Sequence, residues 1–167
     1  MTPFDFASLA AVAQLGLGLA GFSGIGLVLT RRAGRLETFE LYRLGVMLGT
    51  AVGAMILALV PIAVSQFGAD AEATCRISAA LMALLSASLG VYYRIAILYF
   101  RRTVPEIVGP VASRLVFTLH LANALVQTLA AIGLIENCVG LYWLGLFWLL
   151  LAGTYQFARI LFIRPRD

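Results

Sequence analysis

The sequence predicts an all-α membrane protein: a bundle of five transmembrane helices with the N-terminus outside the cell and the C-terminus in the cytoplasm. Three observations support this. The 167 residues are 62% hydrophobic and only 12% charged, with a mean hydropathy of +0.97, whereas soluble domains carry about 25% charged residues. Five apolar stretches reach the roughly 20 helical residues that cross a hydrocarbon core. The arginines gather at alternate ends of these stretches.

The first predicted span should remain in the mature protein. The opening letters MTPFD carry no positive charge, and no small-residue cleavage site precedes Arg31 and Arg32, so a cleavable signal peptide is not indicated. Thr2, Pro3 and Asp5 instead suit the N-cap, the first position and the first turn of a helix. We therefore expect this helix to begin near residue 3.

The last two spans have to be separated by a turn. The apolar stretch from 112 to 162 is too long for one crossing at about 1.5 Å per residue. The letters IENCVG at 135–140 supply Glu136, Asn137 and Gly140 as turn residues. The predicted spans, all in a single domain over 1–167, are about 4–29, 40–66, 75–100, 112–135 and 140–162.

The arginines predict the orientation of the bundle. Ten of the twelve flank the first connection, the third connection and the C-terminal end, and cytoplasmic loops retain positive charge. The second connection, FGADAEATC, and the fourth carry mainly acids. Because the net charge of +4 sits at span ends, it does not indicate a nucleic-acid partner. The ten arginines are Arg31, Arg32, Arg35, Arg43, Arg101, Arg102, Arg114, Arg159, Arg164 and Arg166.

Small residues recur every four positions on the first two spans. In lipid, close contact between such faces is a main source of helix association, so the two faces could approach each other backbone to backbone. The interpretation stays open between packing inside one protomer and a face that joins copies of the chain or lines a pore. The residues are Gly16, Ala20, Gly24, Gly45, Gly49 and Gly53.

Stretches of the first two spans carry a family resemblance. The letters AGFSGIGLVL end in arginines, and LYRLGVMLGT is followed by Pro61 near the outer end of the second span. The first 61 residues thereby resemble a widespread family of small bacterial membrane proteins with a Gly-Phe-Ser/Ala-Gly motif and no established activity. The resemblance implies a bacterial inner-membrane location. The matching positions are Gly21, Phe22, Ser23, Gly24, Arg43 and Leu44.

Polar side chains inside the spans are the main functional candidates, because they are costly in a membrane. His120, Asn123 and Gln127 fall at i, i+3 and i+7 and so share one helical face. Either this face lines a path or binds ions or protons, with His120 titrating near neutrality, or the three side chains hydrogen-bond to neighbouring helices. The remaining candidates for the polar pathway are Gln14, Arg94 and Gln156.

Arg94 is a cation inside a predicted span. At the centre of a helix an arginine costs roughly 2.5–3.5 kcal/mol. One or two turns from the inner end, its guanidinium can snorkel to the headgroups. The alternative is that Arg94 meets His120, Gln156 or a backbone carbonyl and sets an electrostatic barrier to cations.

The two cysteines are both predicted to lie on the outer side of the membrane. Cys75 begins the third span and Cys138 lies in the fourth connection. Disulfides persist in that compartment, so a Cys75–Cys138 bond is predicted. The alternative is two buried thiols that stay reduced.

Motifs for catalysis or cofactor binding are missing from residues 1–167. There is no HExxH, CxxC, Walker A loop or nucleophile elbow, and GLGLAG lies inside a hydrophobic stretch that follows no strand. We therefore expect no enzyme, no cofactor and no metal site. Two functions are compatible with the sequence: a homo-oligomer that forms a pore or pathway for ions, protons or a small solute, or a non-catalytic accessory subunit that binds another membrane protein or membrane lipid.

Overall fold

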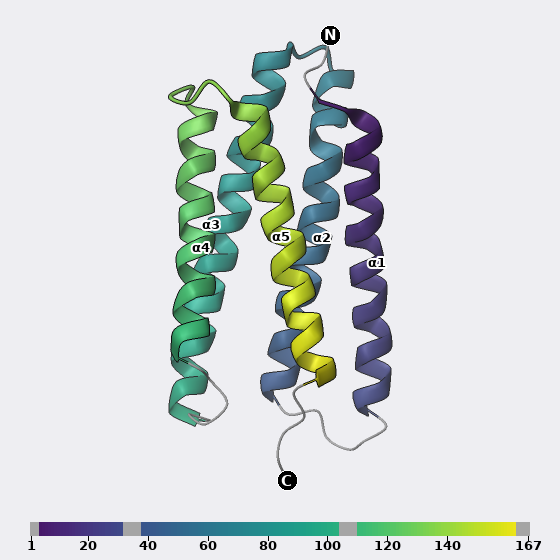
Figure 1. The fold of residues 1–167 in the computed structure, drawn as a ribbon, viewed down its shortest axis with the longest axis vertical. Coiled ribbons are helices and arrows are strands. Elements are labelled where there is room, and N and C mark those ends of the chain that lie inside the picture. The colour runs from purple at the N-terminus through teal and green to yellow at the C-terminus, as the bar shows by residue number, and fades with distance from the viewer. Residues whose placement is uncertain (1–3, 32–37, 104–109, 163–167) are drawn as a thin grey trace.

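The described part of the chain forms five helices that run alternately up and down (Figure 1). The computed structural model describes residues 4–31, 38–103 and 110–162. The start of α1 and the end of α5 lie at opposite ends of the bundle, as an odd number of alternating helices requires (Figure 1). The helices are α1 (Phe6–Arg31), α2 (Thr38–Gln66), α3 (Ala71–Thr103), α4 (Pro110–Ala131) and α5 (Cys138–Phe162).

Helix α1 begins later than the sequence predicts. Its first residue is Phe6, and Asp5 is the N-cap: Asp5 Oδ1 accepts a hydrogen bond from the Ala7 N–H at 3.1 Å, and Oδ2 accepts one from Ser8 Oγ. These bonds, the Ser8 bond foremost, lower the pKa of the Asp5 carboxyl. The expected start near residue 3 is wrong because a carboxylate here satisfies the free N–H groups of the first turn. Thr2 and Pro3 lie outside the described residues.

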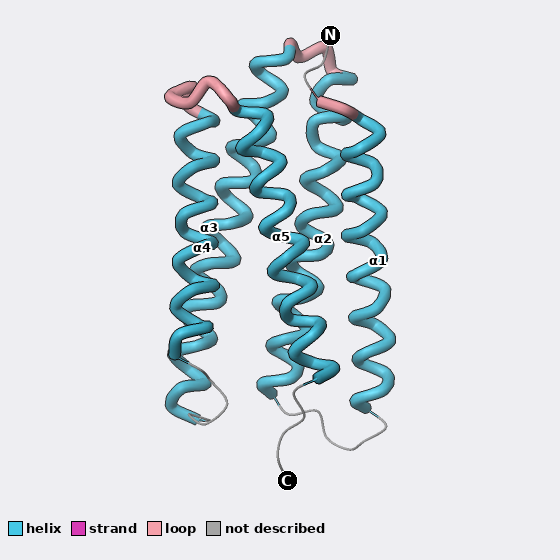
Figure 2. The backbone as a smooth tube through the Cα atoms, in the orientation of Figure 1, coloured by secondary structure: helices cyan, strands magenta, loops and turns pink. Residues whose placement is uncertain are grey.

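The described connections at the upper end of the bundle are short (Figure 2). Residues next to the helix ends stop or cap the helices there. Gly68 (φ +82°) follows α2, and Gly133 (φ +78°) follows α4, the left-handed backbone that glycine adopts after a helix. Asn137 Oδ1 accepts from the Gly140 N–H at 3.1 Å and caps α5. The predicted turn is therefore present, but it begins after Ala131 rather than after residue 135, because Gly133 already ends α4.

Four of the helices in the described chain are long and apolar enough to cross a membrane. The helix that does not meet this criterion is α4. Its sequence holds Arg114, His120, Asn123 and Gln127, which lower its mean hydropathy whichever way they point. The four spans are Phe6–Ile25, Leu41–Gln66, Ala71–Arg102 and Cys138–Ala158.

The core is built around α2 and α5, with α1 and α4 on opposite sides of the bundle (Figure 1). The larger cluster includes Leu9, Met82, Tyr142 and Leu146, all fully buried. The Tyr142 hydroxyl, on α5, donates to the carbonyl oxygen of Leu57 on α2. This places a satisfied polar group inside the apolar core and links its two central helices.

The glycine face of α1 does not meet the glycine face of α2, although Gly16 approaches the α2 backbone. A Cβ on Gly16 would lie 2.7 Å from the Ala51 carbonyl oxygen and 3.0 Å from the Met55 nitrogen, so α1 touches the α2 backbone there. The glycines of α2 instead face α3. The Leu85 side chain packs against Gly53, and the Leu89 side chain packs against Gly49. The reason is that α2 lies between α1 and α3, and its glycine row and its Ala51 row point to different neighbours.

The other predicted packing residues contribute less within the protomer. Gly24 has no neighbouring atom within 4 Å of an added Cβ, and Gly45 has only the Tyr92 hydroxyl at 3.9 Å. Ala20 is half-buried. Gly16 is thus the residue of the α1 row whose missing side chain permits close helix approach.

Candidate functional site

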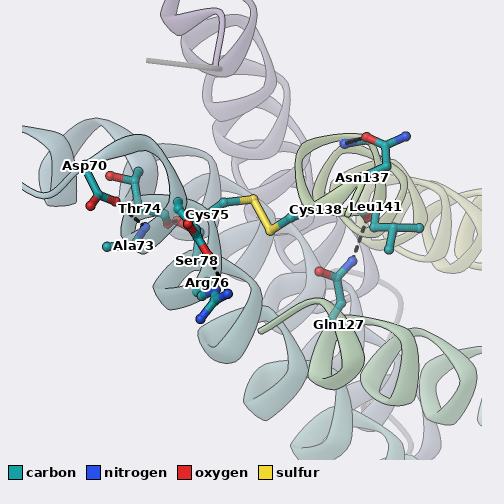
Figure 3. Close-up of a disulfide and its surroundings, with 12 residues drawn as sticks. Asp70, Ala73, Thr74, Cys75, Arg76, Ser78, Gln127, Asn137, Cys138 and Leu141 are labelled. Carbon is teal, nitrogen blue, oxygen red and sulfur yellow. Dashed lines mark hydrogen bonds and ion pairs between the residues drawn. A yellow bond between two sulfur atoms is a disulfide. The ribbon is translucent and has the colours of Figure 1, made fainter. Parts of the chain in front are cut away.

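The polar face of α4 turns toward α3 and α5. Asn123 Nδ2 donates to Ser86 Oγ on α3 at 2.7 Å, and Gln127 Nε2 donates to the Leu141 carbonyl oxygen on α5 at 2.7 Å, a bond drawn in Figure 3. Gln127 Nε2 also lies 3.4 Å from Asn123 Oδ1. These hydrogen bonds join three helices, as the second of the two sequence interpretations predicts.

Gly145 on α5 makes room for this network. A Cβ there would lie 2.7 Å from Gln127 Nε2 and 3.1 Å from Asn123 Oδ1, so the Gln127 amide would have to shift to admit it. The sequence analysis missed both Gly145 and Ser86. A glycine within the bulky run YWLGLFWLL is a visible signal of a close approach, but its partner is not readable from the sequence.

His120 is 1% exposed and fixed by two neighbouring helices. Its Nδ1 accepts a hydrogen bond from Trp148 Nε1 at 3.3 Å, and the two rings meet edge to face with centroids 5.3 Å apart. A Cβ on Gly90 would lie 3.4 Å from His120 Cβ, so α3 also packs against this residue. Because Nδ1 is the acceptor, the hydrogen of the neutral ring is assigned to Nε2.

A groove of about 310 Å³ runs between α4 and α5 beside His120. Its wall is mostly aliphatic, and its rim includes Leu115 and Leu151, which are 58% and 49% exposed. The groove therefore opens to the surroundings of the bundle. Its lining residues come from the first half of α4 and the second half of α5, with Val46 contributed by α2.

Gln156 is the second polar residue of the groove that is almost completely buried. It is 3% exposed, and its Oε1 has no hydrogen-bond partner among the described residues. A buried amide oxygen without a partner costs about 1–3 kcal/mol. The groove thus has an apolar wall and one acceptor that the protein itself leaves unsatisfied.

The structure does not bring the other two predicted pathway residues to this cluster. Gln14 is exposed at the surface of the bundle on α1. Arg94 is exposed, and its guanidinium carbon lies 5.7 Å from the centre of the Phe117 ring, a cation–π distance. The alternative contact of Arg94 with His120 or Gln156 is not found in the described part of the chain, where the guanidinium lies over an aromatic ring of α4.

The predicted disulfide is confirmed. Cys75 of α3 and Cys138, the first residue of α5, are bonded with their Cα atoms 6.2 Å apart (Figure 3). Beside them, Arg76 forms an ion pair with Glu72. The bond ties the beginnings of two helices together at the end of the bundle opposite the arginine-rich ends.

The described residues contain no group of three or more His, Cys, Asp or Glu side chains placed to hold a metal ion. The site is therefore characterised by its groove and its hydrogen-bonding residues. The described chain is all-helical, and four of its helices are long and apolar enough to cross a membrane. No family model matches it, and comparison with curated proteins and with solved structures gives no match either.

Proposed function

We propose that this is a non-catalytic membrane protein that binds a lipid-soluble molecule in the groove between α4 and α5. The observation that carries the proposal is Gln156, a buried amide with an unsatisfied oxygen in a groove whose wall is mostly aliphatic. Binding pockets for small molecules combine apolar walls with a few convergent polar groups. An apolar molecule with a polar head would cover the wall and supply the missing partner.

The network on α4 favours this proposal over a pathway for ions or protons. Asn123 Nδ2 and Gln127 Nε2 donate to Ser86 and to the Leu141 carbonyl, so these donors are directed to other helices, while Gln127 Oε1 is buried without a partner in the described chain. A path for ions needs a polar lining. The groove has a mainly aliphatic one.

We further propose that α4 is a fifth span and that the N-terminus faces outward in a bacterial inner membrane. Helix α4 runs alongside the others (Figure 1). His120 and Gln127 are buried and Asn123 bonds to Ser86 on α3, which lowers the cost of these three side chains in a bilayer. Helices α1 and α3 end, and α2 and α4 begin, at the same end of the bundle (Figure 1). Arg43, Arg101, Arg102 and Arg114 lie near that end, which the positive-inside rule assigns to the cytoplasm.

The binding proposal is tested by filling the groove. Leu151→Trp places a large ring at its rim, whereas Leu144→Trp changes another exposed leucine two turns away on the same face of α5, outside the groove. In native mass spectrometry of protein purified in mild detergent, we expect wild type and Leu144→Trp to retain an added mass of lipid size. Leu151→Trp should lose it. Equal retention by both variants, or none in wild type, contradicts the proposal.

A second candidate function, self-association, is favoured by Gln14. This amide is exposed on a membrane-spanning helix, on the face that also holds Ala11, Gly18 and Gly21. A side-chain amide both donates and accepts, so the same residue of a second copy is a suitable partner, and such bonds in membranes contribute about 0.6–2 kcal/mol. Energy transfer between labelled copies in liposomes should fall in Gln14→Leu and not in Leu15→Ala. Unchanged transfer in Gln14→Leu contradicts this interface.

A further inference from the structure

The polar end of the groove also indicates what kind of head group its ligand carries. We infer that the bound molecule is a neutral, single-chain lipid whose head is a hydroxyl group. This rests on the proposed function, because it assigns a ligand class to the same groove. Three features of the groove lead to it: a donor, an acceptor and the absence of charge.

The donor is His120. Trp148 Nε1 donates to its Nδ1 at 3.3 Å, so the neutral ring carries its hydrogen on Nε2. Among the described residues, Nε2 has no hydrogen-bond partner, and His120 lines the groove. The His120 Nε2–H group can therefore donate a hydrogen bond to a ligand head that carries an acceptor.

The acceptor is Gln156. Its Oε1 is buried without a partner in the described chain, and only a donor can satisfy an amide oxygen. A ketone, an ester or a quinone carbonyl accepts and does not donate, so it leaves this atom unsatisfied. A hydroxyl group can both accept from His120 and donate to Gln156, and these two residues line the same groove.

Charge and size exclude larger polar heads. No charged side chain lines the groove in the described residues, whereas proteins bind phosphate through arginine, lysine or helix N-termini. A volume of about 310 Å³ is at the low end for ligand pockets, which run from about 300 to 1,000 Å³. It therefore suits one hydrocarbon chain rather than a whole phospholipid.

Trp148 provides the measurement, because it lines the groove and bromine atoms quench indole fluorescence on contact. The chain has two tryptophans, so Trp143→Phe leaves Trp148 as the single reporter. This variant is reconstituted in phosphatidylcholine vesicles with one of four brominated probes. The probes are dibrominated octadecanol, the methyl ester of dibrominated octadecanoic acid, a dibrominated alkane and a dibrominated phosphatidylcholine.

We expect the alcohol to reach half-maximal quenching at a mole fraction about threefold to tenfold lower than the ester, the effect of one hydrogen bond. In Trp143→Phe/Gln156→Leu, the alcohol and the ester should quench alike. The reverse reporter, Trp148→Phe, leaves Trp143 outside the groove and should not distinguish the probes.

The outcomes separate the two proposals. If alcohol and ester quench Trp148 equally, and both do so at lower mole fractions than the phospholipid, the groove binds lipids but the hydroxyl assignment is overturned. If none of the single-chain probes is preferred over the brominated phospholipid, bulk lipid tails explain the quenching and both proposals are wrong. The comparison of probes needs no variant within the groove, so misfolding of Gln156→Leu does not affect it.

Discussion

Asn123 and Gln127 illustrate how a helix in this bundle carries amides whose donors are paired with other helices. Each donates to a neighbouring helix at 2.7 Å, one to the Ser86 hydroxyl and the other to the backbone carbonyl of Leu141. In the membrane span that we propose for α4, lipid offers no competing partner, so the alternative for each group is an unsatisfied donor in hydrocarbon. At the residue scale, these side chains hold α4 to the rest of the bundle.

The Asn123–Ser86 hydrogen bond should be measurable as a coupling energy. We expect the effects of Asn123→Ala and Ser86→Ala on the free energy of unfolding to be non-additive by about 0.6 kcal/mol. An upper value for such bonds in membrane proteins is roughly 1.7 kcal/mol. A double-mutant cycle on the free energy of unfolding in detergent micelles gives this number. The pair Thr128→Ala and Ser86→Ala is the control, because Thr128 Oγ1 donates to Ala124 O within α4. Additivity in the Asn123 cycle would contradict the bond.

At the scale of elements, α1 shows why several glycines in one helix are not equivalent. Gly16 touches the α2 backbone at Ala51 and Met55, whereas Gly18, two residues on, has nothing within 4 Å of an added Cβ. Successive residues of a helix point about 100° apart, so only one narrow face can meet a given neighbour. Four-residue spacing identifies that a face exists, but not which helix it contacts.

This difference predicts that a glycine-to-alanine substitution has different effects on stability at Gly16 and at Gly18. Gly16→Ala should destabilise the protein by about 1–3 kcal/mol, because the new methyl group meets backbone atoms that cannot rotate away. Gly18→Ala should be neutral or stabilising by up to about 1 kcal/mol, since alanine favours the helix and the position is open. Thermal unfolding in one detergent compares the two. Equal melting temperatures would show that α1 does not pack on α2 at Gly16.

At the scale of the whole molecule, the disulfide closes a loop of 63 residues between α3 and α5. In the chain-entropy account, a bridge over a loop of this length stabilises by about 4 kcal/mol. In detergent, we expect Cys75→Ser/Cys138→Ser to have a clearly lower melting temperature than oxidised wild type. Its melting temperature should match that of wild type in excess reductant. The two proteins should differ little from each other once wild type is reduced. Free thiols at both positions in unreduced, denatured protein would contradict the bond.

The orientation of the bundle is a second prediction at this scale. Alkaline phosphatase fused after Phe67, in the α2–α3 connection, should be active, because that enzyme matures outside the inner membrane. Green fluorescent protein fused after Asp167 should fluoresce, since it requires the cytoplasm. If only one of the two reporters is active, Phe67 and Asp167 lie on the same side of the membrane, and the odd number of crossings is wrong, α4 with it.

Much of the fold was predictable from local sequence. Apolar runs of about 20 residues predicted α1, α2, α3 and α5 as spans, and Gly68, Gly133 and Asn137 show why the chain turns where it does. The candidate site was only partly predictable. The shared face of His120, Asn123 and Gln127 follows from spacing, but their partners Ser86, Gly145 and Trp148 lie on helices distant in sequence.

The sequence by itself determined what depends on residues close along the chain: the apolar helices, their caps and turns, and the face that each polar residue occupies. Hydropathy, capping and helical periodicity act over a few residues, so they are encoded locally. The tertiary structure alone decided which faces meet: Gly16 with α2, the α2 glycines with α3, Arg94 with Phe117 rather than with His120. Those contacts depend on the rotation and position of whole helices, and it is their arrangement that leaves Gln156 unsatisfied in the groove between α4 and α5.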